Sequence, residues 1–164
     1  MQDLRHELYT VKSVVELEQI AIKQFDIPAY ELMLRAGQAT FDLLLQRFST
    51  CSNILVLCGA GNNAGDGYVV ARLAKQAGLQ VRLISLIDPG SLKNEAEQAY
   101  RAWLEVCDES ERVTEHDITS ASILIEECEV IIDALLGTGL QRSVKDHWSD
   151  WMDQVLSLIH ISEP

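Results

Sequence analysis

Hydrophobic residues near the start of this chain recur at three- and four-residue spacings, a period that predicts amphipathic helices. The first such helix has its apolar positions at Val11, Val14, Val15, Leu17, Ile20, Ala21 and Phe25. Pro28 separates it from a second helical pattern that ends near Phe48. The apolar face of this second helix is Leu32, Met33, Ala36, Ala39, Leu43 and Leu44. We expect both helices to pack against the core.

From residue 53 the pattern changes to short, continuous apolar runs, which are typical of strands covered on both faces. Residues 54–58 form such a run, and we expect further strands at 81–86 and 130–134. Between the first two we expect a loop over 59–67, a helix from about Tyr68 to Ala77 and a stop at Gly78. A further helix is expected over 92–106, followed by irregular acidic sequence over 107–117 and a short helix.

Strands that alternate with helices predict a single α/β domain. The crossover connections should be right-handed and the sheet doubly wound and mainly parallel, as in Rossmann-like folds, with helices on both faces. The chain shows no internal repeat, no low-complexity tract and no domain boundary.

The loop after the first strand is a candidate ligand site. Its sequence over 59–64, GAGNNA, fits the pattern G-x-G-x-x-A, and the N–H groups that open the next helix can receive a phosphate. Two amides, Asn62 and Asn63, and the carboxylate of Asp66 are concentrated there. We therefore expect a ligand at the carboxyl edge of the sheet. The alternative is that the glycines only turn the chain.

A nicotinamide dehydrogenase fragment is one interpretation of this loop. Asp88, near the end of the second strand, would then bind the ribose. However, Asp66 would place a negative charge close to the phosphate site, and Asp88 before Pro89 and Gly90 is equally well explained as a turn former. We prefer the turn.

The net charge of the chain disfavours some classes of binding partner. The 164 residues include 25 acidic and 13 basic side chains, a net charge of -12. Such a field repels nucleic acids and anionic membranes, so a phosphate would have to be held by local backbone donors. No apolar run approaches the roughly 20 residues that span a bilayer, and the N-terminus leads into no signal sequence. We expect a cytoplasmic protein without nucleic-acid or membrane partners.

The four cysteines give no sign of a metal or redox site. Cys51, Cys58, Cys107 and Cys128 form no C-x-x-C pair and have no accompanying histidine spacing. We expect reduced and mostly buried thiols.

Four segments in order along the chain point to one family. They are LYT at 8–10, ELMLRAG at 31–37, GAGNNAGDG at 59–67 and DALLGTG at 133–139. Together they resemble the YjeF N-terminal domain family, the NAD(P)H-hydrate epimerases, over residues 8–154. The segment over 59–67, which carries the two asparagines, is the most specific of the four. Ala64 stands where the family more often has glycine. The resemblance implies a three-layer α/β/α domain of the YjeF N-terminal type over residues 1–156.

The resemblance also implies a substrate site made from two loops. The implied substrate-binding residues are Asn62, Asn63, Ala64, Gly65 and Asp66, followed by Gly137, Thr138, Gly139, Leu140, Gln141, Arg142 and Ser143. A potassium ion would be held by Asn63 and Asp133, and amide and carboxylate oxygens suit a hard cation. Arg142 and Lys145 would either meet phosphate or remain solvated.

The activity implied by the resemblance is metabolite repair. Such an epimerase interconverts the R and S forms of hydrated NADH or NADPH at C6 of the nicotinamide ring, so the hydrate is a substrate and not a redox cofactor. C6 is a hemiaminal carbon, and its inversion requires a group that moves a proton. The candidate catalytic carboxylates are Asp133 first and Asp66 second. Whether Asp133 moves the proton or supports the cation stays open.

A non-catalytic nucleotide-binding or scaffold domain of the same family is the competing class. The presence of Asn62, Asn63, Asp66 and Asp133 together favours the enzyme. In many bacteria the family's domain is fused to an ADP-dependent hydrate dehydratase, so a fused or separate dehydratase is an expected partner. A homodimer is also compatible with the resemblance.

The resemblance stops before the end of the chain. The family continues to another strand and an S-x-D-x-P-S-G type segment that completes the site, and this segment is missing here. We expect a domain that is incomplete at its C-terminus and weakened in activity. Residues 157–164 do not resemble the family and are expected to be an extraneous tail, such as a sequence artefact.

Overall fold

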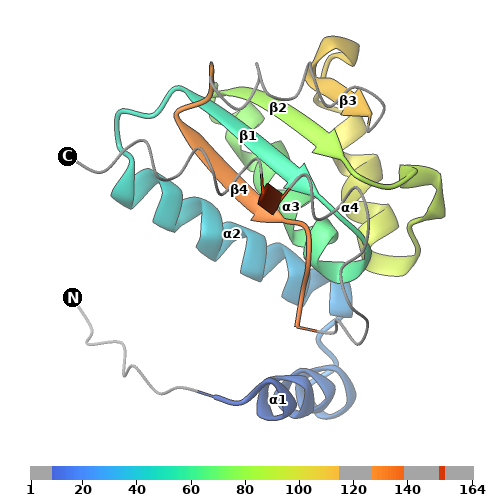
Figure 1. The fold of residues 1–164 in the computed structure, drawn as a ribbon. Coiled ribbons are helices and arrows are strands. Elements are labelled where there is room, and N and C mark those ends of the chain that lie inside the picture. The colour runs from blue at the N-terminus through green and yellow to red at the C-terminus, as the bar shows by residue number, and fades with distance from the viewer. Residues whose placement is uncertain (1–8, 115–126, 139–151, 154–164) are drawn as a thin grey trace.

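The computed structural model describes residues 9–114, 127–138 and 152–153 (Figure 1). Its helices are α1 (Val11–Gln24), α2 (Ala29–Arg47), α3 (Gly61–Gln76) and α4 (Asn94–Leu104), with short 3-10 turns η1 (Pro89–Ser91) and η2 (Glu109–Glu111). Its strands are β1 (Asn53–Cys58), β2 (Gln80–Ser85), β3 (Arg112–Thr114) and β4 (Val130–Ala134).

The strands form one parallel sheet in the order β3-β2-β1-β4 (Figure 1). From β1 the chain steps outward through β2 to β3 and then returns to the other side of β1 for β4. The direction of winding therefore reverses between β1 and β4. In open α/β sheets this switch point is where the loops at the carboxyl ends leave room for a ligand. The predicted α/β class with a parallel, Rossmann-like sheet is confirmed.

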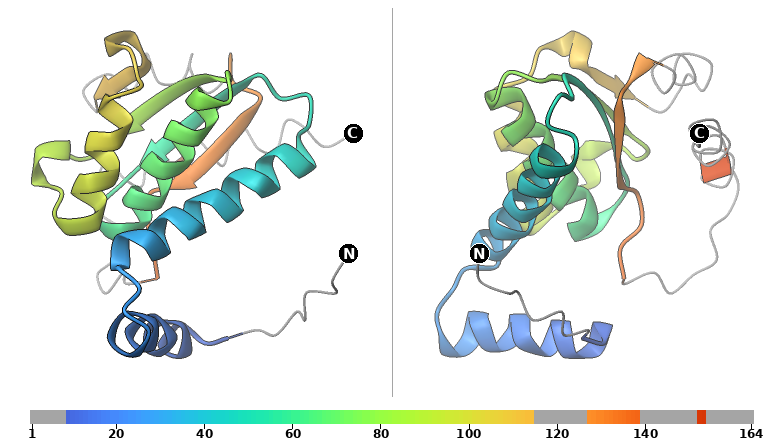
Figure 2. Two further views of the ribbon diagram at one scale, coloured as in Figure 1. Left: turned by 180° about the vertical axis from the view of Figure 1, so that it is seen from behind. Right: turned by 90° about the vertical axis from the view of Figure 1, so that its left-hand side faces the viewer.

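Strand β1 is the centre of the core and is buried on both faces. Ile54, Val56 and Cys58 point to the cluster that the helices cover, whereas Leu55 and Leu57 point to the opposite face. Figure 2 shows α2, α3 and α4 together on the first face. The described residues that pack against the second face include Leu135, Leu136 and Met152. The remaining segments expected to cover this face lie outside the described residues.

Helix α3 begins at Gly61 and not, as the sequence predicted, near Tyr68. Most of the expected glycine and asparagine loop is therefore helical. A Cβ on Gly65 would lie 2.5 Å from Cε of Met33 in α2, and a Cβ on Gly67 would lie 2.6 Å from Cβ of Ala134 in β4. The glycines allow α3 to approach its neighbours closely, and this packing outweighs their low intrinsic helix propensity.

The two N-terminal helices pack differently from the prediction. Helix α1 forms over nearly the predicted residues, but none of them is buried, so it is not a core helix. Helix α2 does pack on the core, although through a shifted face: Gly37 and Phe41 are buried, whereas Leu43 is 51% exposed. Gly37 belongs to the buried face because Val69 of α3 occupies the space beside it.

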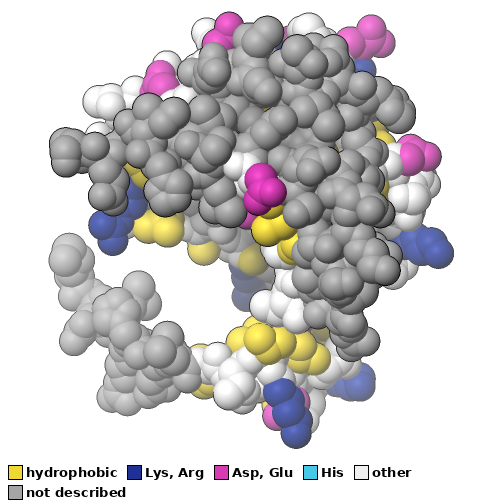
Figure 3. Space-filling model, viewed as in Figure 1, with side chains coloured by type: hydrophobic (Ala, Val, Ile, Leu, Met, Phe, Trp, Pro, Cys, Tyr) yellow, Lys and Arg dark blue, Asp and Glu magenta, His cyan; other side chains and the backbone are white. Residues whose placement is uncertain are grey.

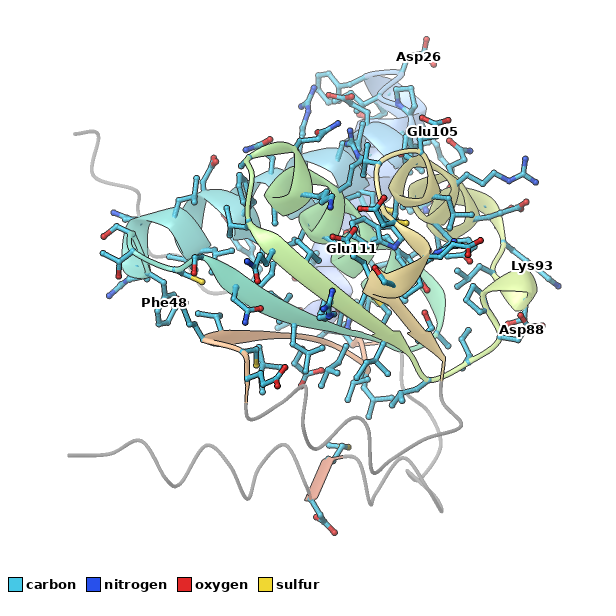
Figure 4. All side chains as sticks on the ribbon, turned by 90° about the horizontal axis from the view of Figure 1, so that it is seen from above. Asp26, Phe48, Asp88, Lys93, Glu105 and Glu111 are labelled. Carbon is cyan, nitrogen blue, oxygen red and sulfur yellow. The ribbon has the colours of Figure 1, made fainter. Side chains whose placement is uncertain are left out.

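The segment after α4 is more ordered than its acidic sequence indicated. It forms η2 and the short edge strand β3. Glu111, which Figure 4 labels, is buried, and Nζ of Lys75 in α3 lies 2.5 Å from its carboxylate. The backbone N–H of Asp108 also donates to this carboxylate, at 2.9 Å. An ion pair between distant segments has no local signal in the sequence.

The four cysteines are reduced and lie outside any disulfide, as predicted. Cys58 is fully buried, and burial raises the pKa of its thiol. The other three are only half-buried, which is less burial than expected. In the part of the chain that the structure describes, no helix has the length and apolar character to cross a membrane.

Replacement of Gly67 by alanine tests the close packing of α3 on the sheet. The new methyl group would overlap Ala134 and lie 2.9 Å from Sγ of Cys58. We expect Gly67→Ala to lower the free energy of unfolding by about 1–3 kcal/mol, which outweighs the gain of about 0.5–1 kcal/mol in helix propensity. Denaturant unfolding of this variant and of Gln76→Ala, a control at the exposed end of α3, measures the difference. A Gly67→Ala protein as stable as the control would contradict the packing argument.

Candidate functional site

The first turn of α3 carries the two predicted asparagines. Gly61 has φ +70, a conformation that favours glycine, and it turns the chain from β1 into the helix. Ala60 is the N-cap residue and has no side-chain acceptor for the first N–H groups of the helix. These N–H groups open at the carboxyl edge of the sheet, where they can donate to acceptor atoms of a ligand.

This first turn meets the loop that follows β4. A Cβ placed on Gly137 would lie 3.1 Å from Cβ of Asn63 and 3.9 Å from its Oδ1. The ends of the two strands are also in contact: the N–H of Gly59, just after β1, donates to the carbonyl of Ala134 in β4 at 3.0 Å. The backbone of Leu135 fills the space where a Cβ of Gly59 would stand. The two predicted substrate loops are therefore neighbours at the switch point between β1 and β4.

Asp133 lies at the same edge but on the other face of the sheet. It is paired in register with Leu57, and side chains on paired positions of parallel strands point the same way, which here is away from α3. Its side chain is exposed, and its Oδ1 accepts the N–H of Leu135 at 3.0 Å. A ligand in contact with both Asn63 and Asp133 would have to reach over the edge of the sheet.

Asp66 lies one turn after Asn63 on α3, and positions three apart share a helix face. It is half-buried, and its backbone carbonyl lies 3.5 Å from the place of a Cβ on Gly37 in α2. Burial raises the pKa of Asp66 to about 6, with a smaller contribution in the same direction from the charge of Glu18. A carboxyl group with this pKa is present in both protonation states near neutral pH, so it can both give and take a proton.

The remaining predicted residues divide into three groups. Ala64 and Gly65 are buried beneath the first turn, whereas Asn62, Gly137 and Thr138 are exposed at the edge. The other predicted residues lie outside the described part of the chain: Gly139, Leu140, Gln141, Arg142, Ser143 and Lys145. Sequence reasoning did not single out Glu18, whose signal was a charge within the apolar face of the first helix.

Asp88 is a turn residue, as preferred above. Its Oδ1 accepts the N–H of Gly90 at 2.9 Å and it caps η1 (Figure 4). Within the described ranges, no three His, Cys, Asp or Glu side chains gather as a metal site. The predicted cation ligands Asn63 and Asp133 both carry side-chain oxygens and both lie at the carboxyl edge.

Known proteins match this chain in sequence and in structure. The family described as "YjeF-related protein N-terminus" matches residues 29–161. The bifunctional NAD(P)H-hydrate repair enzyme Nnr of Escherichia coli (strain K12) is 38% identical over 152 residues, which cover 93% of this chain and 28% of that protein. The NAD(P)H-hydrate epimerase of Roseobacter litoralis is 32% identical over 149 residues, 83% of this chain and 66% of that protein.

The fold agrees with a solved structure at low sequence identity. The crystal structure of the yeast protein ynu0 (YNL200c) superposes with a TM-score of 0.81 and 17% identity, covering 94% of this chain and 67% of that one. The chain thus spans about a quarter of the bifunctional relatives and two thirds of the epimerase.

The raised pKa of Asp66 predicts a specific dependence of stability on pH. The folded protein holds the proton up to about pH 6, whereas the unfolded chain releases it near 3.8. The stabilisation from this group is therefore complete below pH 3.8 and is lost as the pH rises through 6. We expect Asp66→Asn, which cannot ionise, to match wild type at pH 4 and to melt at a higher temperature than wild type at pH 8.

Thermal melts across this pH range measure the effect. Asp42→Asn, at an exposed position of α2, serves as the control and should follow the wild-type curve. Equal pH dependence in wild type and Asp66→Asn would show that Asp66 is not protonated in the folded protein near neutrality.

Proposed function

This chain belongs to the family of YjeF-related protein N-termini, and on that premise we propose that it is an NAD(P)H-hydrate epimerase. It interconverts the R and S forms of hydrated NADH or NADPH at C6 of the nicotinamide ring. Relatives that carry this activity in their names support the proposal. The observation that carries it is the meeting of Asn63 with the Gly137 loop at the switch point, one helical turn from Asp66.

The reaction moves protons and no electrons. C6 carries both the ring nitrogen and a hydroxyl group. In ring opening, the C6–N bond breaks, the hydroxyl proton leaves, the nitrogen gains a proton and C6 becomes an aldehyde; closure on the opposite face gives the other epimer. Loss and return of water at C6 has the same requirement for one proton taken and one returned.

Asp66 is the residue best suited to carry this proton. It is half-buried, its pKa is about 6, and it shares a helix face with Asn63. Asp133 has a different environment, because its exposed carboxylate already accepts the N–H of Leu135. In this proposal Asp133 orients the second loop and Asp66 transfers the proton, which reverses the order of the two candidates in the sequence analysis.

The first-turn N–H groups of α3 are the proposed donors to the dinucleotide. They open at the edge where Gly137 and Thr138 are exposed. In a protein of net charge -12, neutral backbone donors at a helix N-terminus hold a phosphate without a basic surface.

We include a potassium ion in the proposal. The amide of Asn63 and the carboxylate of Asp133 are hard oxygen donors that suit this cation. Because Asp133 points to the face of the sheet away from α3, an ion held by both residues would sit over the carboxyl edge between the two faces. Bound there, the ion would supply a fixed positive charge to the edge of an acidic protein. Asn63 would then bridge the two loops, since it stands against Gly137.

Two further parts of the proposal concern the cellular setting. The partner enzyme is an ADP-dependent hydrate dehydratase, fused or separate, since relatives of this chain are named bifunctional repair enzymes. We also place the protein in the cytoplasm. A homodimer stays a prediction.

Chromatographic separation of the two epimers over time tests the activity. We expect wild type to interconvert the R and S hydrates, and Asp66→Asn to be slower by about 10²–10⁴-fold, the usual contribution of a general acid or base. Gln76→Ala, at the far end of α3, is the matched control. An Asp66→Asn protein as fast as wild type would assign the proton transfer to another group. Binding of hydrate without any conversion by wild type would favour a non-catalytic domain.

Thermal melts in potassium chloride and in lithium chloride at equal concentration test the cation site. A cation at 100 times its dissociation constant stabilises by about 2.7 kcal/mol, so the melting temperature should be higher in potassium. Asn63→Ala should remove the difference between the two salts, whereas Gln76→Ala should retain it. Equal melting temperatures of wild type in the two salts over a wide concentration range would argue against the site.

A further inference from the structure

The buried hydroxyl groups in the described part of the chain are those of Tyr68 in α3 and Ser85 at the end of β2. Charged side chains, by contrast, stand at the surface, as Figure 3 shows for one face of the molecule. The side chain of Tyr68 is 0% exposed, and its hydroxyl oxygen lies 3.0 Å from that of Ser85. The two buried hydroxyl groups are therefore hydrogen-bonded to each other.

Ser85 stands on a face of the sheet that is otherwise apolar. It pairs in register with Cys58 of β1, so both side chains point to the face that α3 covers. The other residues of β1, β2 and β4 on this face are Ile54, Val56, Val81, Leu83, Val130, Ile132 and Ala134. Two buried hydroxyl groups lose their hydration, and an apolar pair of the same shape would pack equally well. Packing alone therefore does not account for this pair.

The rest of the buried face of α3 has little that fixes the rotation of the helix about its axis. Apart from Tyr68, its buried residues are Ala64, Gly65, Gly67, Val69, Val70, Ala71 and Ala74. Apolar contacts of this kind are not directional. A hydrogen bond, by contrast, requires a particular distance and angle. Tyr68 is the one large side chain on this face, and its hydroxyl supplies the directional contact.

Tyr68 joins three elements below the carboxyl edge of the sheet. Its hydroxyl bonds to Ser85, the last residue of β2. Its ring meets the ring of Tyr100 in α4, with centroids 5.1 Å apart and planes tilted by 59°, an arrangement that aromatic pairs favour. Burial raises the pKa of the Tyr68 phenol, so the hydroxyl keeps its proton near neutral pH. The junction of α3, β2 and α4 is thus held by one side chain.

The two polar residues of the candidate site on α3 lie just before this side chain. Asn63 precedes Tyr68 by five residues and Asp66 by two, so both are within about one and a half helical turns of it. A rotation of α3 that breaks the bond between Tyr68 and Ser85 would also turn Asn63 away from Gly137. Those two residues are in close contact, since a Cβ on Gly137 would lie 3.1 Å from Cβ of Asn63.

We propose that Tyr68 is a positioning residue of the candidate site: its hydrogen bond to Ser85 sets the rotation of α3 on the sheet and so places Asn63 against the loop after β4. Asp66 takes its position with the same turn of the helix. Tyr68 acts only through these residues, because its own side chain is buried beneath them. The catalytic meaning of this assignment rests on the proposed function.

Paired deletions of the two hydroxyl groups separate the bond from the packing. Tyr68→Phe and Ser85→Ala each leave one buried hydroxyl without its partner, so both should melt at a lower temperature than wild type. The double variant Tyr68→Phe/Ser85→Ala leaves neither, keeps the ring against Tyr100 and should recover most of the melting temperature. Tyr100→Phe, which removes a half-buried hydroxyl outside the bond, is the control. Single variants that melt like wild type would overturn the proposal.

The position of α3 in the double variant can be measured without substrate. We would record, in the full chain, the nuclear Overhauser effect between Hβ of Asn63 and Hα of Gly137, together with the side-chain amide resonances of Asn63. In the double variant the Overhauser effect should weaken and the amide resonances should shift, whereas Tyr100→Phe should keep the wild-type values. Wild-type values in the double variant would overturn the proposal, since the pair would then serve packing alone. If the double variant does not fold, Tyr68→Phe is measured with the same expectation.

The kinetics of epimerisation connect this position to the proposed function. In the double variant kcat should fall by about 10–100-fold, because a misplacement of about 1 Å can cost about 10²-fold in rate, and KM for the hydrate should change less than kcat. A merely structural role would restore kcat together with the melting temperature and would overturn the positioning role. If wild type does not convert the hydrate, the proposed function fails, while the Overhauser effect still decides whether Tyr68 positions Asn63.

Discussion

The close approach of backbone to backbone at the switch point is the constraint on which the rest of the structure depends. Gly59, at the end of β1, lies so near Leu135 that any side chain would collide with it, and Gly67 of α3 rests against Ala134. These contacts bring the N-terminus of α3 against the loop after β4. Were either glycine larger, the helix would move outward, and Asn63 would lose its contact with the second loop.

The same packing sets the electrostatics of the site. Because α3 is held tightly between α2 and the sheet, Asp66 in its second turn is half-buried, and burial is the largest cause of its raised pKa. Asp133, by contrast, points to the face of the sheet away from α3, and its carboxylate is exposed. Two carboxylates of one acidic protein thereby have different surroundings, one half-buried and one exposed.

Some features followed from local sequence. Short apolar runs located β1, β2 and β4 to within one residue. The run is continuous in β1, because this strand is buried on both faces. Asp88 was assigned to a turn by its neighbours. The motif after β1 placed Asn62, Asn63 and Asp66 at the carboxyl edge, because the segment that follows a parallel strand begins at that edge of the sheet. The start of α3 was misplaced because glycine and asparagine have low helix propensity, and only packing against α2, α4 and β4 makes this segment helical.

By itself, the sequence determined the fold class, the order of its elements and the edge of the sheet at which the candidate site lies, because these depend on periodicity and on short motifs. Only the tertiary structure decided which face each residue occupies. It put Asp133 on the side of the sheet away from α3, exposed α1 and joined Lys75 to Glu111. Such pairings join residues far apart in the chain, and they arise from the register and close packing of whole elements, for which no local pattern exists.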